Sequence, residues 1–147
     1  MEPAAAGSVW RILRVVEIRE AREQDAEQIR EIYVASYGPD YPYSHVYDLY
    51  GLKKVIFSDD TLILVAEDPD SGDILGTASV ILEIGAYTDL VGEFGRLAVL
   101  PEARHQGIGA LLLEARLERV RDRLHVGMME ARVTHPFTQM IAQRQGF

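Results

Sequence analysis

Residues 93–113 read EFGRLAVLPEARHQGIGALLL, and this stretch carries most of the information about the fold. The apolar segment from Phe94 to Val99 predicts a strand that ends before Pro101, since proline cannot donate a backbone hydrogen bond to a sheet. A helix is predicted from Ile108 to about Leu124, and its apolar residues lie on two sides, which indicates heavy burial. The stretch therefore consists of a strand, a short loop with two glycines, and a helix.

The two glycines stand at the predicted start of this helix. The first turn of a helix has about four N–H groups without partners inside the helix, and the helix dipole adds roughly half a positive charge there. No Ser, Thr, Asp or Asn directly precedes Ile108 as a cap, and Gly107 and Gly109 let the backbone approach a bulky anion. The pattern favours a phosphate ligand. The alternative is a glycine-rich loop that only turns the chain.

Two other phosphate-binding motifs fit this segment less well. A Walker loop requires Lys and then Ser or Thr after the glycine, but Ala110 follows Gly109. A dinucleotide fingerprint requires a third glycine at the position of Leu112. Glu130 lies at about the spacing of a ribose contact, so a nucleotide-binding fold stays open as an alternative.

The elements predicted along the chain form a layered α/β or α+β domain with a mixed sheet. Strands are predicted at about 15–19, 62–66, 74–84, 94–99 and 128–133, and helices at about 24–37, 47–57, 108–124 and 136–145. We expect residues 1–13 to form a flexible tail and residues 14–147 to form one domain, because the chain has the length of a single ordinary domain.

The composition argues against several functional classes. The chain has no cysteine, which excludes disulfides, thiolate metal sites and a cysteine nucleophile. Its net charge is −8, whereas nucleic-acid binding needs positive charge to displace counterions. The arginines of residues 116–123 alternate with acidic residues and predict a solvated helix face. No apolar run approaches the roughly 20 residues that span a bilayer. We therefore expect a cytoplasmic protein that binds neither nucleic acid, membrane nor metal.

Residues 104–109, Arg-x-x-Gly-x-Gly, resemble the Gln/Arg-x-x-Gly-x-Gly/Ala signature of the GNAT superfamily of acetyl-CoA-dependent N-acetyltransferases. Residues 97–99, the opening at 18–26 and the closing Gly-Phe at 146–147 also resemble segments of that family, in matching order. The resemblance implies a mixed, mostly antiparallel central sheet flanked by helices. Members usually continue with two more strands, so we expect this sequence to lack them. A second subunit, as in a homodimer, can cover the exposed sheet.

The resemblance also implies acetyl-CoA as the cofactor and the residues that bind it. Backbone amides at the helix start bind the pyrophosphate in this interpretation, and backbone groups of the preceding strand pair with the pantetheine arm and polarise the thioester. Two side chains of the loop flank the phosphates. The predicted cofactor residues are Leu97, Ala98, Val99, Arg104, His105, Gln106, Gly107, Ile108, Gly109 and Ala110.

The implied reaction is direct attack of a primary amine on the thioester. Removing the proton of a lysine-like amine near neutral pH costs on the order of 4 kcal/mol, so a base is needed. Glu93 is the predicted base and Glu83 a second candidate. The family's terminal Asn and Tyr correspond here to His135 and Ala142; Ala142 cannot donate a proton, and His135 is the remaining candidate acid. A catalytically weak acyl-CoA-binding or regulatory module is the alternative function.

Tyrosines and prolines crowd residues 37–50. In the family this region borders the acceptor cleft, and aromatic faces attract ammonium groups by roughly 0.5–2 kcal/mol. A cationic small-molecule or peptide amine is therefore the predicted acceptor, with Tyr37, Tyr41 and Tyr43 as its predicted contacts. A tyrosine-rich loop that packs on the sheet is the alternative.

Overall fold

The computed structural model of the protein describes residues 15–130 and 136–147, so the tail predicted over residues 1–13 lies outside the described residues. The strands are β1 (Glu17–Glu20), β2 (Thr61–Glu67), β3 (Ile74–Ile84), β4 (Leu90–Val99) and β5 (Val126–Met129). The helices are α2 (Ala26–Tyr37), α3 (Leu49–Ile56), α4 (Ile108–Val120) and α5 (Pro136–Arg144), with 3-10 turns at Glu23–Asp25, Gly38–Asp40, Ser44–Tyr47 and Pro101–Ala103. The order of strands and α-helices is the predicted one.

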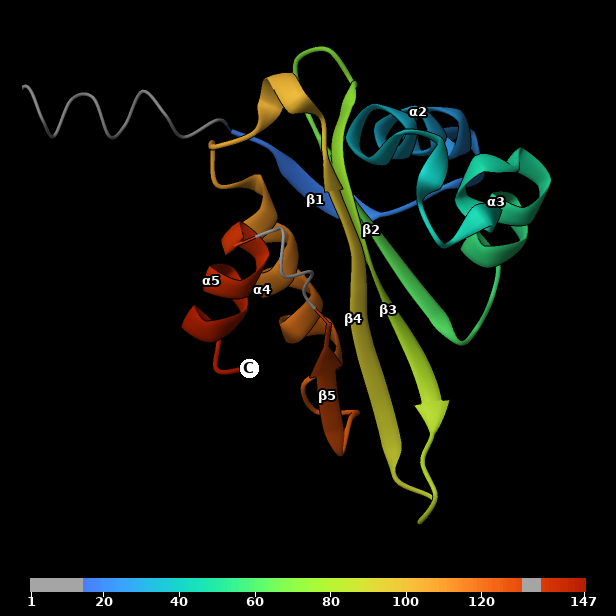
Figure 1. Ribbon diagram of the computed structural model, residues 1–147, viewed down its shortest axis with the longest axis vertical. Helices are drawn as coiled ribbons and strands as arrows, with labels where there is room; N and C mark the ends of the chain where they lie inside the picture. Colours follow the sequence, from blue (N-terminus) through green and yellow to red (C-terminus); the bar gives the residue numbers. More distant parts are fainter. Residues whose placement is uncertain (1–14, 131–135) are drawn as a thin grey trace, which may run out of the picture.

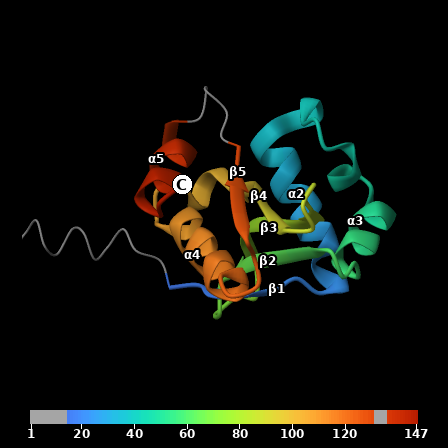
Figure 2. The ribbon, with the colours of Figure 1, turned by 90° about the horizontal axis from the view of Figure 1, so that it is seen from below.

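The five strands form one sheet in the order β1-β2-β3-β4-β5 (Figure 1). The first four strands are antiparallel to their neighbours, and β5 runs parallel to β4. Helices α2 and α3 lie on one face of the sheet, and α4 and α5 lie on the other (Figure 2). The predicted mixed, mostly antiparallel sheet flanked by helices is confirmed.

Strand β2 shows why the sheet needs helices on both faces. Its side chains alternate between two cores: Ile63 and Val65 pack with α2, whereas Leu64 and Ala66 pack with α4. Successive side chains of a strand point to opposite faces, so a strand between two helical layers is apolar at every position. This explains the unbroken apolar run that predicted the strand.

Several element boundaries differ from the prediction by a few residues, most of all around β4, α4 and β5. Strand β4 begins at Leu90 rather than Phe94, because its hairpin with β3 extends to the pair Ile84 and Leu90. Gly92, in the part of β4 that the prediction missed, has no side chain to pack, which weakens the strand signal in the sequence. Helix α4 ends at Val120, and β5 begins at Val126, where its pairing with β4 starts.

No helix within residues 15–130 and 136–147 is both long and apolar enough to cross a lipid bilayer.

A partly buried ion cluster joins β1 and β2 to the start of α2. The Asp25 side chain accepts hydrogen bonds from Arg19 Nη1 and Nη2 at 2.7 and 3.0 Å and from the backbone N–H of Arg22 at 2.7 Å. Arg19 Nε also donates to Glu67 on β2. Burial alone raises the pKa of Asp25, but the hydrogen bonds from Arg19 and Arg22 outweigh burial and hold that pKa below its usual value.

We predict that Asp25→Ala lowers the free energy of unfolding by about 3 kcal/mol at neutral pH, because it leaves the Arg19 charge without its main partner. The folded-state pKa of Asp25 is depressed, so its contribution is complete above the ordinary value of 3.8 and is lost as the pH falls through the folded-state pKa. Urea unfolding of both proteins at neutral and acid pH measures the difference, which should shrink in acid. The exposed Asp70→Ala is the control, and a loss of under about 1 kcal/mol for Asp25→Ala contradicts the prediction.

Candidate functional site

Helix α4 begins without a side-chain cap. Its N-cap residue is Gly107, which is left-handed at φ 83° and forms no side-chain cap hydrogen bond. The Leu111 N–H donates to the Gly107 carbonyl at 3.0 Å, which is the first bond of the helix. The N–H groups of residues 108–110 therefore have no partner within the helix. The predicted helix start at Ile108 is confirmed, and so is its lack of a side-chain cap.

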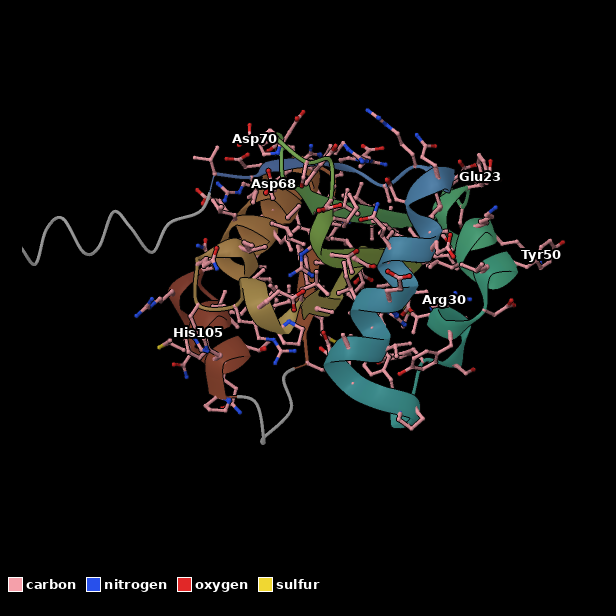
Figure 3. The ribbon with its side chains drawn as sticks, turned by 90° about the horizontal axis from the view of Figure 1, so that it is seen from above. Glu23, Arg30, Tyr50, Asp68, Asp70 and His105 are labelled. Atoms are coloured by element: carbon pink, nitrogen blue, oxygen red, sulfur yellow. The ribbon has the colours of Figure 1, made fainter. Side chains whose placement is uncertain are left out.

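A cavity of about 380 Å³ adjoins this helix start. Its walls come from the end of β4, the loop before α4, the first turn of α4, and α5. Every predicted cofactor residue lines this cavity except Gln106, whose side-chain amide contacts the Glu102 carbonyl at 3.5 Å. His105 lies on the loop next to α5, where its ring packs edge-on against Phe137 with centroids 5.1 Å apart (Figure 3). The structure thus brings most of the predicted cofactor residues together around one space.

Strand β4 offers an open backbone edge to this cavity. Within residues 15–130 and 136–147, β5 pairs with residues 91–94 of β4, and Figure 1 shows it beside only part of β4. The Leu100 N–H donates to Leu75 on β3 at 2.9 Å, and backbone groups alternate sides along a strand. The groups of Leu97 and Val99 therefore point to the side away from β3.

Both edge carbonyls already have side-chain partners. The Leu97 carbonyl accepts a hydrogen bond from the Tyr37 hydroxyl. The Val99 carbonyl accepts from Ser36 Oγ at 3.3 Å and from Arg104 Nε at 3.0 Å. Because a carbonyl oxygen has two lone pairs, an extended ligand on this edge could share the Leu97 oxygen with Tyr37. At the Val99 oxygen it would have to displace Ser36 or Arg104. Arg104, predicted to lie beside phosphates, uses one donor to hold the strand.

A β-bulge interrupts β4 just before this edge. The register changes from Ser79 opposite Gly95 to Thr77 opposite Ala98, so two residues of β4, Arg96 and Leu97, face one residue of β3. Arg96 is left-handed at φ 54°, which costs a non-glycine residue roughly 1–2 kcal/mol. Bulges bend the strand that carries them. This one begins two residues beyond Phe94, the last residue of β4 that pairs with β5 in the described part of the chain.

A second cavity, of about 260 Å³, lies at the bulge. Glu93 and all three predicted acceptor tyrosines line it. Four residues line both cavities, namely Tyr37, Leu97, Thr138 and Ile141. The predicted cofactor residues and the predicted base therefore border two adjoining spaces.

The tyrosines line the cavity and also pack against one another. The rings of Tyr37 and Tyr41 stack with centroids 4.2 Å apart, and Tyr41 meets Tyr43 edge-on at 5.2 Å. The Arg96 guanidinium lies 4.0 Å from the centroid of the Tyr43 ring. One face of Tyr43, predicted as a contact for a substrate cation, is thus occupied by a cation of the protein itself.

The predicted base, acid and ribose-binding residues lie in different parts of the molecule. Glu93 has a side chain 20% exposed, with Oε1 3.9 Å from Arg96 Nη1. Glu83 is exposed near the end of β3, away from both cavities. His135 lies outside the described residues. Ala142 is buried on α5. Glu130, the ribose candidate of the nucleotide-binding alternative, lines the second cavity, away from the helix start.

The expectation of a solvated arginine face on α4 was wrong for Arg116, which is 0% exposed and lines the second cavity. Arg119, Arg121 and Arg123 are exposed as predicted. Arg116 was missed because its acidic sequence neighbours are typical of a surface, while its own position continues the apolar stripe of Leu112 and Leu113. The contributions of Thr138 and Ile141 were also missed, since they depend on how α5 packs.

The family described as "Acetyltransferase (GNAT) domain" matches residues 59–147. This chain belongs to the GNAT acetyltransferase family. An "Uncharacterized N-acetyltransferase" of Archaeoglobus fulgidus is 34% identical to it over 113 residues, which cover 74% of this chain and 76% of that protein. The predicted superfamily is therefore confirmed.

Solved structures share the fold of this GNAT domain. A transcriptional regulator from Bacillus halodurans C-125 superposes with a TM-score of 0.74 at 21% identity, over 90% of this chain and 93% of the other. The structure of AAC(6')-Iy in complex with a bisubstrate analogue, CoA-S-monomethyl-acetylneamine, gives a TM-score of 0.72 at 17% identity, over 90% of both chains. At these identities the likeness establishes the fold.

Proposed function

We propose that this GNAT domain transfers an acetyl group from acetyl-CoA to a primary amine by direct attack. One observation carries the proposal: the uncapped start of α4 faces a cavity of about 380 Å³ that adjoins a second cavity containing Glu93. The family and the CoA bisubstrate complex of a structural relative support the use of acetyl-CoA.

The residues at the helix start fit a diphosphate. The N–H groups of residues 108–110 carry the partial positive charge of the helix terminus, and they lack partners within the helix. Gly109 lines the cavity, and a Cβ built there meets only side-chain atoms, Ile141 Cδ1 at 3.4 Å and Leu97 Cδ2 at 3.7 Å. These backbone groups would hold the pyrophosphate, and the edge of β4 would align the pantetheine arm. The cofactor supplies an activated acetyl thioester.

Glu93 is the proposed base. Its carboxylate lies in the second cavity, on the pairing segment of β4 just before the bulge. It accepts the proton of the attacking amine directly or through a water molecule. The departing thiolate, with a pKa near 8.5 for a simple thiol, leaves without an acid or with a proton from His135. Ala142 contributes no proton.

Two measurements test the proposal. A panel of amines is mixed with acetyl-CoA and a chromogenic disulfide that reacts with the released CoA thiol, and thiol release that depends on the amine is the expected result. A thermal-shift titration compares CoA with NAD, and CoA is expected to raise the melting temperature. Stabilisation by NAD alone would favour the nucleotide-binding alternative over the acetyltransferase.

A CoA-binding regulatory module of the same fold is the second candidate. Two points support it. The family resemblance implies that Ala142 stands where members usually have their acid, and one protein of the same fold is a transcriptional regulator. This candidate predicts stabilisation by CoA without thiol release for any amine.

A further inference from the structure

Two arginines with unpartnered N–H groups border the second cavity. Arg116 reaches it from α4 and is 0% exposed. Arg96 reaches it from the bulge, with a side chain 11% exposed. Among the described residues, Arg116 Nη2 and Arg96 Nε and Nη1 are buried without a hydrogen-bond partner. Buried donors are nearly always paired in folded proteins, so this concentration of unused donors needs an explanation.

Arg116 has only neutral partners. Its Nη1 donates to the carbonyls of Ser79 at 2.9 Å and Gly95 at 3.2 Å, and its Nε contacts the Leu112 carbonyl at 3.3 Å. Within residues 15–130 and 136–147 no carboxylate forms an ion pair with it. Burial lowers the pKa of Arg116 to about 10, so the side chain is still a cation at neutral pH. A buried charge without a counterion is costly.

Arg96 adds a second cation at the same cavity. Its nearest carboxylate, on Glu93, is 3.9 Å from Nη1, beyond hydrogen-bond distance. The positive charge of Arg96 also acts on its surroundings: burial first, and then this charge, lowers the pKa of the adjacent His45. The cavity thus has two guanidinium groups together with the carboxylates of Glu93 and Glu130.

We propose that the acceptor amine also carries an oxyanion, a carboxylate or a phosphate, which Arg96 and Arg116 bind. This inference rests on the proposed acetyl transfer for the amine end of the acceptor. The planar guanidinium fork matches carboxylate and phosphate oxygens, and charge-assisted hydrogen bonds are the strong ones. The volume of about 260 Å³ suits a small molecule with both groups.

The two cations also act on the amine. They disfavour its protonated form and so oppose the carboxylates of Glu93 and Glu130, which favour that form. An amine without the oxyanion leaves the guanidinium donors unpaired, and sites built to pair polar groups reject analogues that lack them. The inferred acceptor therefore carries both charges, which narrows the predicted class of cationic amines.

Matched acceptors test the inference through kcat/KM. Each pair consists of an amine with an oxyanion and a similar amine without it. β-Alanine with propylamine and lysine with cadaverine test a carboxylate, and phosphoethanolamine with ethanolamine tests a phosphate. We expect the wild-type protein to favour an anion-bearing member by about 10- to 100-fold, the range for hydrogen bonds to a charged group. Arg116→Met should reduce this preference to near unity and keep or raise the melting temperature, while the exposed Arg119→Met keeps the preference.

Structural roles predict a different result. If Arg116 only holds the bulge, Arg116→Met lowers kcat/KM equally for both members of each pair, and that outcome overturns the inference. Equal use of both members by the wild-type protein also overturns it. Should Arg116→Met fail to fold, Arg96→Asn replaces it, since asparagine tolerates the left-handed conformation at that position.

A binding measurement separates this inference from the proposed function. Propionate and inorganic phosphate, which have no amine, are titrated in a thermal-shift assay with CoA present. Stabilisation of the wild-type protein but not of Arg116→Met supports the oxyanion site even if no amine is acetylated. Acetylation of simple amines without any stabilisation by either anion retains the proposed function and refutes the oxyanion site.

Discussion

Replacing Gly109 by phenylalanine is expected to lower the affinity for CoA by more than about 100-fold, or roughly 2.7 kcal/mol, while the domain stays folded. Gly109 lies in the first turn of α4 and lines the larger cavity. Its missing Cβ would lie among the side chains of Leu97 and Ile141, between β4 and α5. A phenyl ring would occupy the space proposed for the cofactor and shield the N–H groups at the helix start. Isothermal titration with CoA measures the loss.

The same position supplies its own control. Gly109→Ala adds one methyl group at ordinary contact distances of 3.4 and 3.7 Å, so its affinity for CoA should stay within about threefold of wild type, or about 0.7 kcal/mol. Leu111→Phe changes a residue of the same helix that is 40% exposed and lies outside both cavities, and it should bind CoA normally. If Gly109→Phe binds CoA as the wild type does while circular dichroism shows a folded domain, the cofactor lies elsewhere.

The helix start could be predicted from sequence because its signals are local. The absence of a capping residue and the two glycines are properties of neighbouring positions. In the structure, Gly107 is the N-cap residue at φ 83° and forms no side-chain cap hydrogen bond. The unbroken apolar run of β2 likewise indicates helices on both faces of the sheet. Such features depend little on what the rest of the chain does.

The second cavity could not be predicted because its signals are not local. It requires the bulge at Arg96, which is a register shift between β3 and β4. Among the described residues, the pairing of β5 with β4 also ends at Phe94, before the bulge. Arg116 was misjudged for a related reason: its surroundings are set by the carbonyls of Ser79 and Gly95 on two other strands. Residues distant in sequence decided its environment.

Glu93→Gln is expected to lower kcat by about 100-fold or more, the usual contribution of a general base, with KM for acetyl-CoA unchanged. Glutamine keeps the size of the side chain but cannot take the proton of the amine. The kcat of the variant should rise steeply with pH. Below the amine pKa of about 10.4, each pH unit raises the neutral fraction of the amine roughly tenfold. Initial rates of thiol release across this range, at saturating acetyl-CoA, measure both effects.

The control for this substitution is Glu83→Gln on the adjacent strand. Glu83 is exposed and away from both cavities, so the same loss of charge there should leave kcat and its pH dependence unchanged. If the kcat of Glu93→Gln is within a few-fold of the wild-type value, Glu93 is not the general base and another group has that role. Glu130 would then be the next candidate, since it is the other carboxylate at the second cavity within the described residues. A parallel loss in Glu130→Gln would assign the proton transfer to it, because a positioned base must lie within reach of the amine.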